Sequence, residues 1–183
     1  MTVRTSPSGP VSDPETLPVG NAENEQLVWD GSRWRTRRGR SYAQANLQGN
    51  HSNPIPVAGE FVPLGGTFNL TNIVDDFDMP QNGRLRYFSP RRVLCTVNAS
   101  ISFSGTLGNL IAFQMARNGN PQVRTEVLQT ILQGGGAVHA VQVTALVRLG
   151  TDDFVEIHVT NQSSTDPVVV RRCCLVVEGG PQN

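Results

Sequence analysis

Apolar and polar residues alternate along most of the chain that follows Thr67. In residues 93–103 an apolar side chain occupies every second position, and this period of two sends one set of side chains to each face of a β-strand. The same pattern, bounded by turn residues, predicts strands over residues 67–74, 84–88, 93–103, 110–117, 123–132, 137–149, 154–161 and 168–177. Serial short strands separated by turns are typical of an all-β antiparallel sandwich or barrel.

The N-terminal part of the chain has a different composition. Residues 1–26 are rich in Pro, Ser, Thr, Gly and Glu, and they contain too few large apolar side chains to offset the entropy of ordering. We therefore expect an extended arm that is disordered on its own. Residues 41–65 look irregular because glycine and proline interrupt them. The sequence thus divides into an arm (1–26), an anchoring segment (27–60) and a sandwich domain (61–183) that begins near Phe61.

The anchoring segment combines a hairpin signal with a run of cations. Asp30-Gly31 lies between two stretches that end in Trp29 and Trp34, and such a dipeptide favours a tight β-turn. Five arginines follow within eight residues: Arg33, Arg35, Arg37, Arg38 and Arg40. They suit docking onto an acidic protein surface or phosphates, or else they form a solvated loop beside the hairpin. The candidate docking residues are Trp29, Trp34, Arg35, Arg37 and Arg38.

Charge and cysteine content narrow the possible partners. The chain has 183 residues, with 15 basic and 15 acidic side chains, so its overall field favours neither nucleic acid nor an acidic membrane as partner. Its three cysteines, Cys95, Cys173 and Cys174, have neither the number nor the spacing of a disulfide framework or a zinc site. The first residues lack the apolar core of a signal peptide. We therefore expect a protein made and kept in soluble form, with free thiols.

Few residues suggest site chemistry. Asp75, Asp76 and Asp78 resemble part of a calcium loop but lack its further ligands, so a solvated acidic turn is the other interpretation. His139 has apolar neighbours at alternate positions and is either a core residue or a trimer-interface residue, whereas His158 is expected to face solvent. The sequence contains no nucleophile-elbow, paired-carboxylate or phosphate-loop motif, so we predict no catalytic residue, metal or cofactor, and no enzymatic activity.

The strand-rich part resembles a known family. The resemblance is carried by residues 93–103, by Ile111-Ala112-Phe113-Gln114-Met115-Ala116-Arg117-Asn118-Gly119, by residues 141–149 and by the turn and strand over residues 149–161. These segments resemble the trimeric jelly roll of tumour-necrosis-factor ligands, complement C1q heads and many bacteriophage fibres and capsid decoration proteins. The segment Val28-Trp29-Asp30-Gly31-Ser32-Arg33-Trp34 resembles short hairpins upstream of such domains in phage structural proteins. The resemblance implies an antiparallel jelly-roll sandwich, a homotrimer and an anchoring N-terminal arm.

The leading functional expectation is a capsid decoration, or cement, protein on the virion surface. It would be assembled in the host cytoplasm and would dock on the major capsid protein, or another virion protein, through its arm. The alternative is a short head or tail fibre that binds a host receptor through loops at residues 118–122, 134–136 and 162–166. A secreted C1q-like or cytokine-like ligand and a cupin-like metalloenzyme are weaker alternatives, since a signal peptide and clustered histidines are missing.

Overall fold

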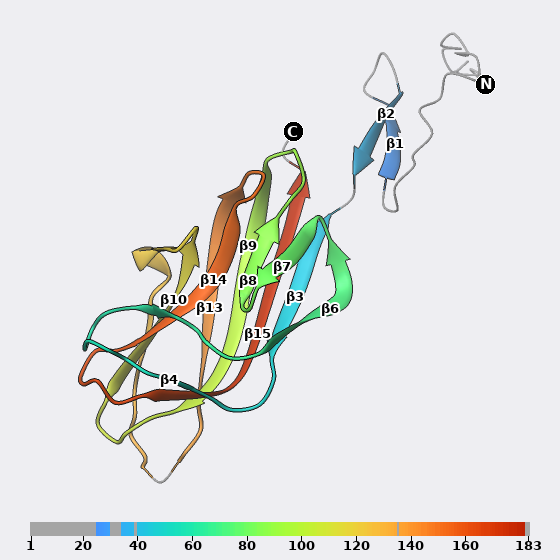
Figure 1. The fold of residues 1–183 in the computed structure, drawn as a ribbon. Coiled ribbons are helices and arrows are strands. Elements are labelled where there is room, and N and C mark those ends of the chain that lie inside the picture. Colours follow the sequence, from blue (N-terminus) through green and yellow to red (C-terminus); the bar gives the residue numbers. More distant parts are fainter. Residues whose placement is uncertain (1–24, 30–33, 39, 135, 182–183) are drawn as a thin grey trace, which may run out of the picture. The chain divides into compact units, whose positions relative to one another are not determined.

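The computed structural model describes residues 25–29, 34–38, 40–134 and 136–181, and nearly all of its regular structure is β (Figure 1). Its elements are β1 (Glu25–Trp29), β2 (Trp34–Arg38), β3 (Ser41–Leu47), β4 (His51–Asn53), β5 (Val62–Pro63), β6 (Phe68–Asp75), β7 (Phe77–Gln81), β8 (Arg84–Tyr87), β9 (Val93–Ser104), β10 (Leu110–Arg117), β11 (Asn120–Pro121), the 3₁₀ turn η2 (Val123–Thr125), β12 (Val127–Thr130), β13 (His139–Leu149), β14 (Phe154–Asn161) and β15 (Val168–Pro181).

Strands β1 and β2 belong to a compact unit of their own, which ends at Gly39. They pair in antiparallel fashion, with Trp29 opposite Trp34 and Glu25 opposite Arg38. The connecting residues 30–33, and residues 1–24 of the arm expected over residues 1–26, lie outside the described part of the chain; the last two residues of the expected arm, Glu25 and Gln26, belong to β1.

The second compact unit begins at Arg40 and is a sandwich of two antiparallel sheets. One sheet has the strand order β13-β9-β15-β3-β6, with β4 paired to β15. The other has the order β11-β10-β14-β8-β7, with β12 paired to β10 and β5 paired to β14. From β8 to β10, and again from β13 to β15, the chain passes from one sheet to the other at each connection. The first of these sheets is called the β9 sheet and the second the β14 sheet.

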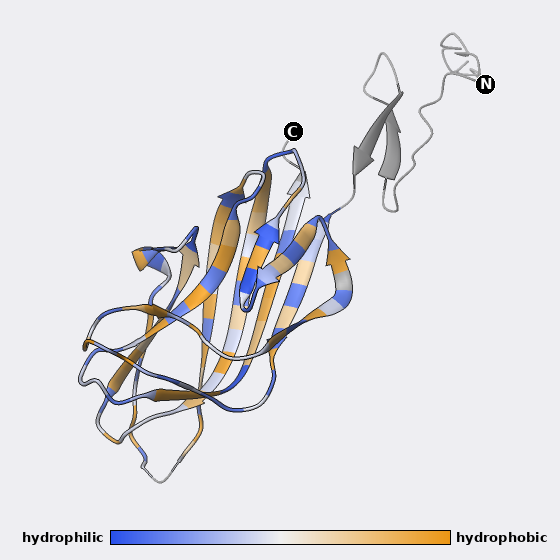
Figure 2. Cartoon of the chain, in the orientation of Figure 1, coloured by the Kyte–Doolittle hydropathy of each residue, from blue (hydrophilic) through white to orange (hydrophobic). Residues whose placement is uncertain are grey.

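The core lies between the two sheets and follows the alternation seen in the sequence. Every second residue of β9 from Val93 to Phe103 is buried in it, because the period of two places these side chains on the inner face. Phe103 of the β9 sheet packs edge-on against Phe113 of the β14 sheet, with 4.8 Å between the ring centroids. Figure 2 shows hydrophobic and hydrophilic positions alternating along the strands.

The start of the sandwich at Phe61 and the irregular segment over residues 41–65 were both wrong predictions. Strand β3 pairs with β15 on one side and β6 on the other, so it lies inside the β9 sheet. Its buried positions are Ser41, Ala43, Ala45 and Leu47. The alternation was present, but small side chains gave it little hydrophobic contrast.

Candidate functional site

The most concentrated group of buried polar side chains lies on the outer face of the β14 sheet. Val155, Ile157 and Val159 of β14 join the core, so Glu156, His158 and Thr160 occupy the opposite face of that strand. All three are nevertheless buried, with 3%, 4% and 0% of their surface exposed. The expectation that His158 faces solvent was therefore wrong. Its strand is central in the sheet, flanked by β10 on one side and by β8 and β5 on the other.

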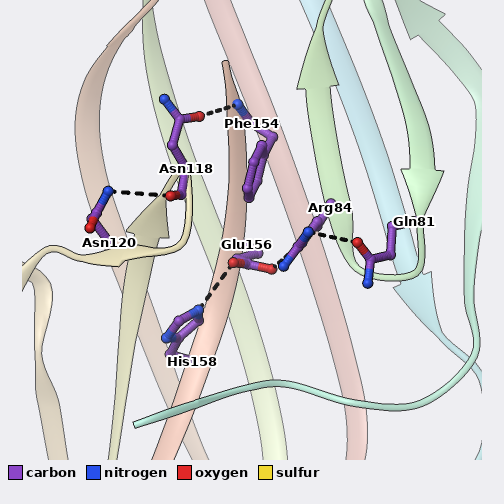
Figure 3. Close-up of polar contacts among 7 residues, drawn as sticks. All are labelled: Gln81, Arg84, Asn118, Asn120, Phe154, Glu156 and His158. Carbon is purple, nitrogen blue, oxygen red and sulfur yellow. Dashed lines mark hydrogen bonds and ion pairs between the residues drawn. The ribbon is translucent and has the colours of Figure 1, made fainter. Parts of the chain in front are cut away.

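Glu156 is the centre of this polar group, as Figure 3 shows. Its Oε2 accepts a hydrogen bond of 2.8 Å from Nε of Arg84, and its Oε1 lies 3.1 Å from Nε2 of His158. Nη1 of Arg84 donates to Oε1 of Gln81 at 2.6 Å, and the guanidinium lies 4.7 Å from the ring centroid of Phe154. Arg84 is thus held by a carboxylate, an amide and an aromatic face.

The pKa of Glu156 reflects competing influences. Burial alone raises it, because a charged carboxylate loses solvation. Hydrogen bonds from His158 and Arg84, together with the charge of Arg84, oppose burial, and the net effect lowers the pKa of Glu156 below its ordinary value. Glu156 is therefore ionised at neutral pH, as a partner of Arg84 should be.

Three buried polar atoms beside this group have no hydrogen-bond partner within the described residues. They are Oε1 of Gln114, Nδ1 of His158 and Oγ1 of Thr160. Gln114 of β10 lies directly opposite His158 of β14. Sequence reasoning missed this group because its members alternate with apolar residues as solvent-facing side chains do. The arrangement orients the guanidinium of Arg84 and links β8 to β14 through the Arg84–Glu156 ion pair.

Of the solvated acidic turn expected over residues 75–78, only Asp76 lies between β6 and β7, and it is buried; Asp75 ends β6, and Phe77 and Asp78 belong to β7. Asp78 makes a two-pronged pair with Arg86, at 2.9 and 2.6 Å, and Ser41 donates a 2.8 Å hydrogen bond to Asp76. Over the described part of the chain, no group of three His, Cys, Asp or Glu side chains is arranged to hold a metal ion. The carboxylates placed here are thus engaged within the protein.

His139, the candidate trimer-interface residue, is the first residue of β13. It pairs with Phe103 of β9, lies on the inward-facing register and is half-buried. The two ring centroids are 6.0 Å apart. Its Nε2 is buried and meets no hydrogen-bonding group of the described chain. The ring thus lies at one end of the sandwich rather than on the outer face of the β9 sheet.

The other predicted site residues are separated from the sandwich along the chain. Trp29, Trp34, Arg35, Arg37 and Arg38 belong to β1 and β2, whose backbone pairing is described and whose side chains are not. Of the loops proposed for receptor binding, residues 118–122 lie at the opposite end of the sandwich from residues 162–166. The amide of Asn118 bonds to Phe154, at the start of β14, whereas that of Gln162 bonds to Leu110, at the start of β10.

Solved structures of known proteins share this architecture. The Eiger TNF from S. frugiperda superposes with a TM-score of 0.59 at 10% identity, over 80% of this chain and 96% of that chain. Murine APRIL gives 0.52 at 7% identity, over 76% and 98%. The PRD1 vertex protein P5 gives 0.50 at 8% identity, over 78% and 97%. No protein-family model matches the chain, and no curated protein matches it.

At these identities the likeness establishes the fold alone. The chain contains an antiparallel jelly-roll sandwich of the kind found in TNF ligands and in the PRD1 vertex protein, and the predicted fold class is confirmed. Within the described residues, the structure contains no helix long and apolar enough to cross a membrane.

Proposed function

We propose that this chain is a virion structural protein, a homotrimeric capsid decoration (cement) protein that docks on the phage head through its N-terminal segment. The observation that carries the proposal is the jelly-roll fold shared with the PRD1 vertex protein P5. The division of the chain at Gly39 supports it, because it assigns Trp29, Trp34 and most of the arginine run to a compact unit other than the sandwich. Three such units in one trimer strengthen a weak single contact through avidity.

The β9 sheet offers the face that best suits contact between protomers. Its outward positions carry mainly uncharged side chains, among them Thr96, Asn98, Ser100, Gln142 and Thr144. The outer face of the β14 sheet carries the ion pairs Arg84–Glu156 and Arg86–Asp78, whereas the β9 sheet carries the exposed pair Arg40–Glu178 near the end of β15. Charged residues are depleted at the centres of protein interfaces, so the β9 sheet is the better trimer surface.

The docking role is tested with the full chain and a variant that lacks residues 1–39, a boundary taken from the compact units. Light scattering at micromolar concentration should give a trimer for both proteins. Only the full chain should cosediment with capsids that were assembled without this protein. Binding by the truncated protein would refute the docking role, and a monomeric full chain would refute the trimer.

Two sets of arginine substitutions, three in the N-terminal unit and two in the sandwich, separate specific docking from general electrostatic attraction. Arg35→Gln combined with Arg37→Gln and Arg38→Gln should weaken capsid binding, as should Trp29→Ala with Trp34→Ala. Arg91→Gln with Arg92→Gln removes exposed cations from the sandwich and should leave binding unchanged. Equal losses from both arginine sets would point to non-specific electrostatics instead.

The alternative is a short fibre whose loops bind a host receptor. It is favoured by exposed apolar side chains at one end of the sandwich, Leu107, Leu132 and Val138, which are 60%, 73% and 61% exposed. Gly134 lies against Leu107 there, and the 162–166 loop adjoins the start of β10 at the same end. Binding of the residue 40–183 protein to host cells, lost on Leu132→Ser, would favour the fibre; a cement protein should ignore cells.

A further inference from the structure

A β-bulge in β15 controls where two adjacent arginines point. Val170 pairs with Phe103 and Arg172 pairs with Ser102, so Arg171 is an extra residue without a counterpart on β9. Before the bulge Val168 and Val170 are buried; after it, Cys173, Leu175 and Val177 are buried. Simple alternation from Val170 would direct Arg172 inward. The bulge instead places it on the outer face of the β9 sheet, a re-aiming that bulges commonly perform.

Arg172 borders a groove on that face. The groove has a volume of about 750 Å³ and is open to solvent. Its polar lining comes from three elements that are far apart in sequence: the end of β3 with its following turn, β9 and β15. The polar and cysteine residues that line it are Asn46, Gln48, Ser100, Ser102, Arg172, Cys173 and Cys174. This volume falls within the range of small-molecule sites, roughly 300–1,000 Å³.

The groove has positive character. Among the residues that line it there is a guanidinium and no carboxylate. Arg172 is exposed, belongs to none of the ion pairs found in the described part of the chain, and donates only a long hydrogen bond of 3.4 Å to the carbonyl of Arg171. An arginine held at the rim of a hollow without an acidic partner attracts an anion from outside.

The neutral groups of the lining supply further donors. Gln44 donates to Oδ1 of Asn46 at 3.3 Å, which leaves the amide nitrogen of Asn46 as its donor. The hydroxyls of Ser100 and Ser102 lie on β9, and Ser102 is the direct neighbour of Arg172 across the strands. A guanidinium, an amide N–H and hydroxyls together match the lone pairs of a planar or tetrahedral oxyanion.

We propose that this groove binds an oxyanion, a carboxylate or phosphate group, with Arg172 as its main contact and Asn46, Ser100 and Ser102 as supporting donors. The site does not depend on the virion role, but it lies on the outer face of the β9 sheet, which is also the face proposed above for contact between protomers. The oxyanion is therefore either a free ligand, where that face is open, or an acidic side chain of a second copy of the chain packed on it. A free oxyanion and a carboxylate from a second copy would use the same contacts in the groove, and the experiment distinguishes the two sources.

The test measures binding of inorganic phosphate and of malonate to the full-length protein by calorimetry, at ionic strength matched with sodium chloride. Arg172→Gln should weaken binding about 10-fold or more, since it removes a charge-assisted hydrogen bond. Arg148→Gln is the matched control, because Arg148 is an exposed arginine on the outer face of the same sheet outside the groove. The double change Ser100→Ala and Ser102→Ala should weaken binding without altering net charge.

Light scattering on the same proteins identifies the source of the anion. Phosphate binding that is lost in Arg172→Gln but kept in Arg148→Gln supports the site with a free ligand. If neither anion binds, but Arg172→Gln lowers the oligomer mass and Arg148→Gln does not, the site is supported with a carboxylate from a second copy. If Arg172→Gln changes neither anion binding nor mass, or if Arg148→Gln has the same effect, the proposal is overturned. The urea midpoint of each variant verifies that it is folded.

Discussion

Arg84 and Glu156 form an ion pair across β8 and β14, with 2.8 Å between Nε and Oε2, in which the carboxylate keeps only 4% of its side-chain surface exposed. The Arg84 side chain is 29% exposed, so water and salt ions screen the ion pair only from the Arg84 side. Removing one partner of such a pair leaves the other charge poorly solvated and unpaired.

Glu156→Gln should therefore lower the free energy of unfolding by about 1–3 kcal/mol at neutral pH. The matched control is Glu178→Gln, which breaks the exposed ion pair with Arg40, and it should change stability little. Urea denaturation measures both. A double-mutant cycle with Arg84→Gln would then isolate the pair, and a coupling energy near zero would contradict its role.

Acidification should destabilise the sandwich. Hydrogen bonds from Arg86 and Asn109 lower the pKa values of Asp78 and Asp166, and those from His158 and Arg84 outweigh burial at Glu156. The folded-state pKa values of these three carboxyl groups lie below their unfolded-state values. The stability that the groups contribute is therefore fully present above about pH 4–5 and is lost as the pH falls through the folded-state values. The urea midpoint of the parent protein should fall as the pH is lowered through this range, and it should fall less steeply in Glu156→Gln. A midpoint that does not change with pH would refute this dependence of stability on protonation.

The three thiols should differ in reactivity. Burial raises the pKa of Cys95 to about 12, and burial followed by the neighbouring Cys174 raises that of Cys173 to about 12. Cys174 lies on the outer face, half-buried, and burial raises its pKa as well. Since the thiolate is the reactive form, iodoacetamide should modify Cys174 first and the other two only after unfolding. Mass spectrometry of the labelled native protein and of the labelled Cys174→Ser variant would show which thiols are modified. Early labelling of Cys95 would contradict the prediction.

Two adjacent glycines near the end of β15 should differ sharply in tolerance. A Cβ added to Gly179 would lie 2.6 Å from Sγ of Cys95, 2.7 Å from Cγ2 of Val93 and 3.0 Å from the carbonyl of Leu94. At Gly180 nothing lies within 4 Å. Gly179→Ala should therefore destabilise the sandwich by about 1–3 kcal/mol through overpacking. Gly180→Ala is the control, and equal thermal midpoints for the two variants would show that β15 and β9 separate easily.

His139 provides a test of the trimer surface. Its ring is on the inward register at the end of β13, so a role in assembly would place protomer contacts at that end of the sandwich. His139→Ala should then lower the oligomer mass relative to the parent protein at the same concentration, as light scattering would reveal. A variant with the mass of the parent protein would remove His139 from the interface.

The strands with strong hydrophobic contrast were predictable from sequence. The predicted residues 110–117 and 154–161 coincide with β10 and β14, and 93–103 differs from β9 by one residue. Strand β3 was missed because serine and alanine fill all of its inner positions except that of Leu47. Residues 123–132 were predicted as one strand, but the chain turns at η2, where the Thr125 hydroxyl accepts from the Met115 amide, before β12 begins.

The all-β class and most turn positions follow from the amino-acid sequence alone, because alternation and turn chemistry act over a few neighbouring residues. Which polar side chains are buried, and which of Cys173 and Cys174 faces the core, depends on how the strands pair in the folded protein. Glu156 and His158 lie beside side chains that the neighbouring strands supply, Arg84 of β8 and Gln114 of β10. Arg172 faces outward because a bulge shifts the register of β15 against β9. These outcomes depend on pairing between strands far apart in sequence, which a local pattern does not encode.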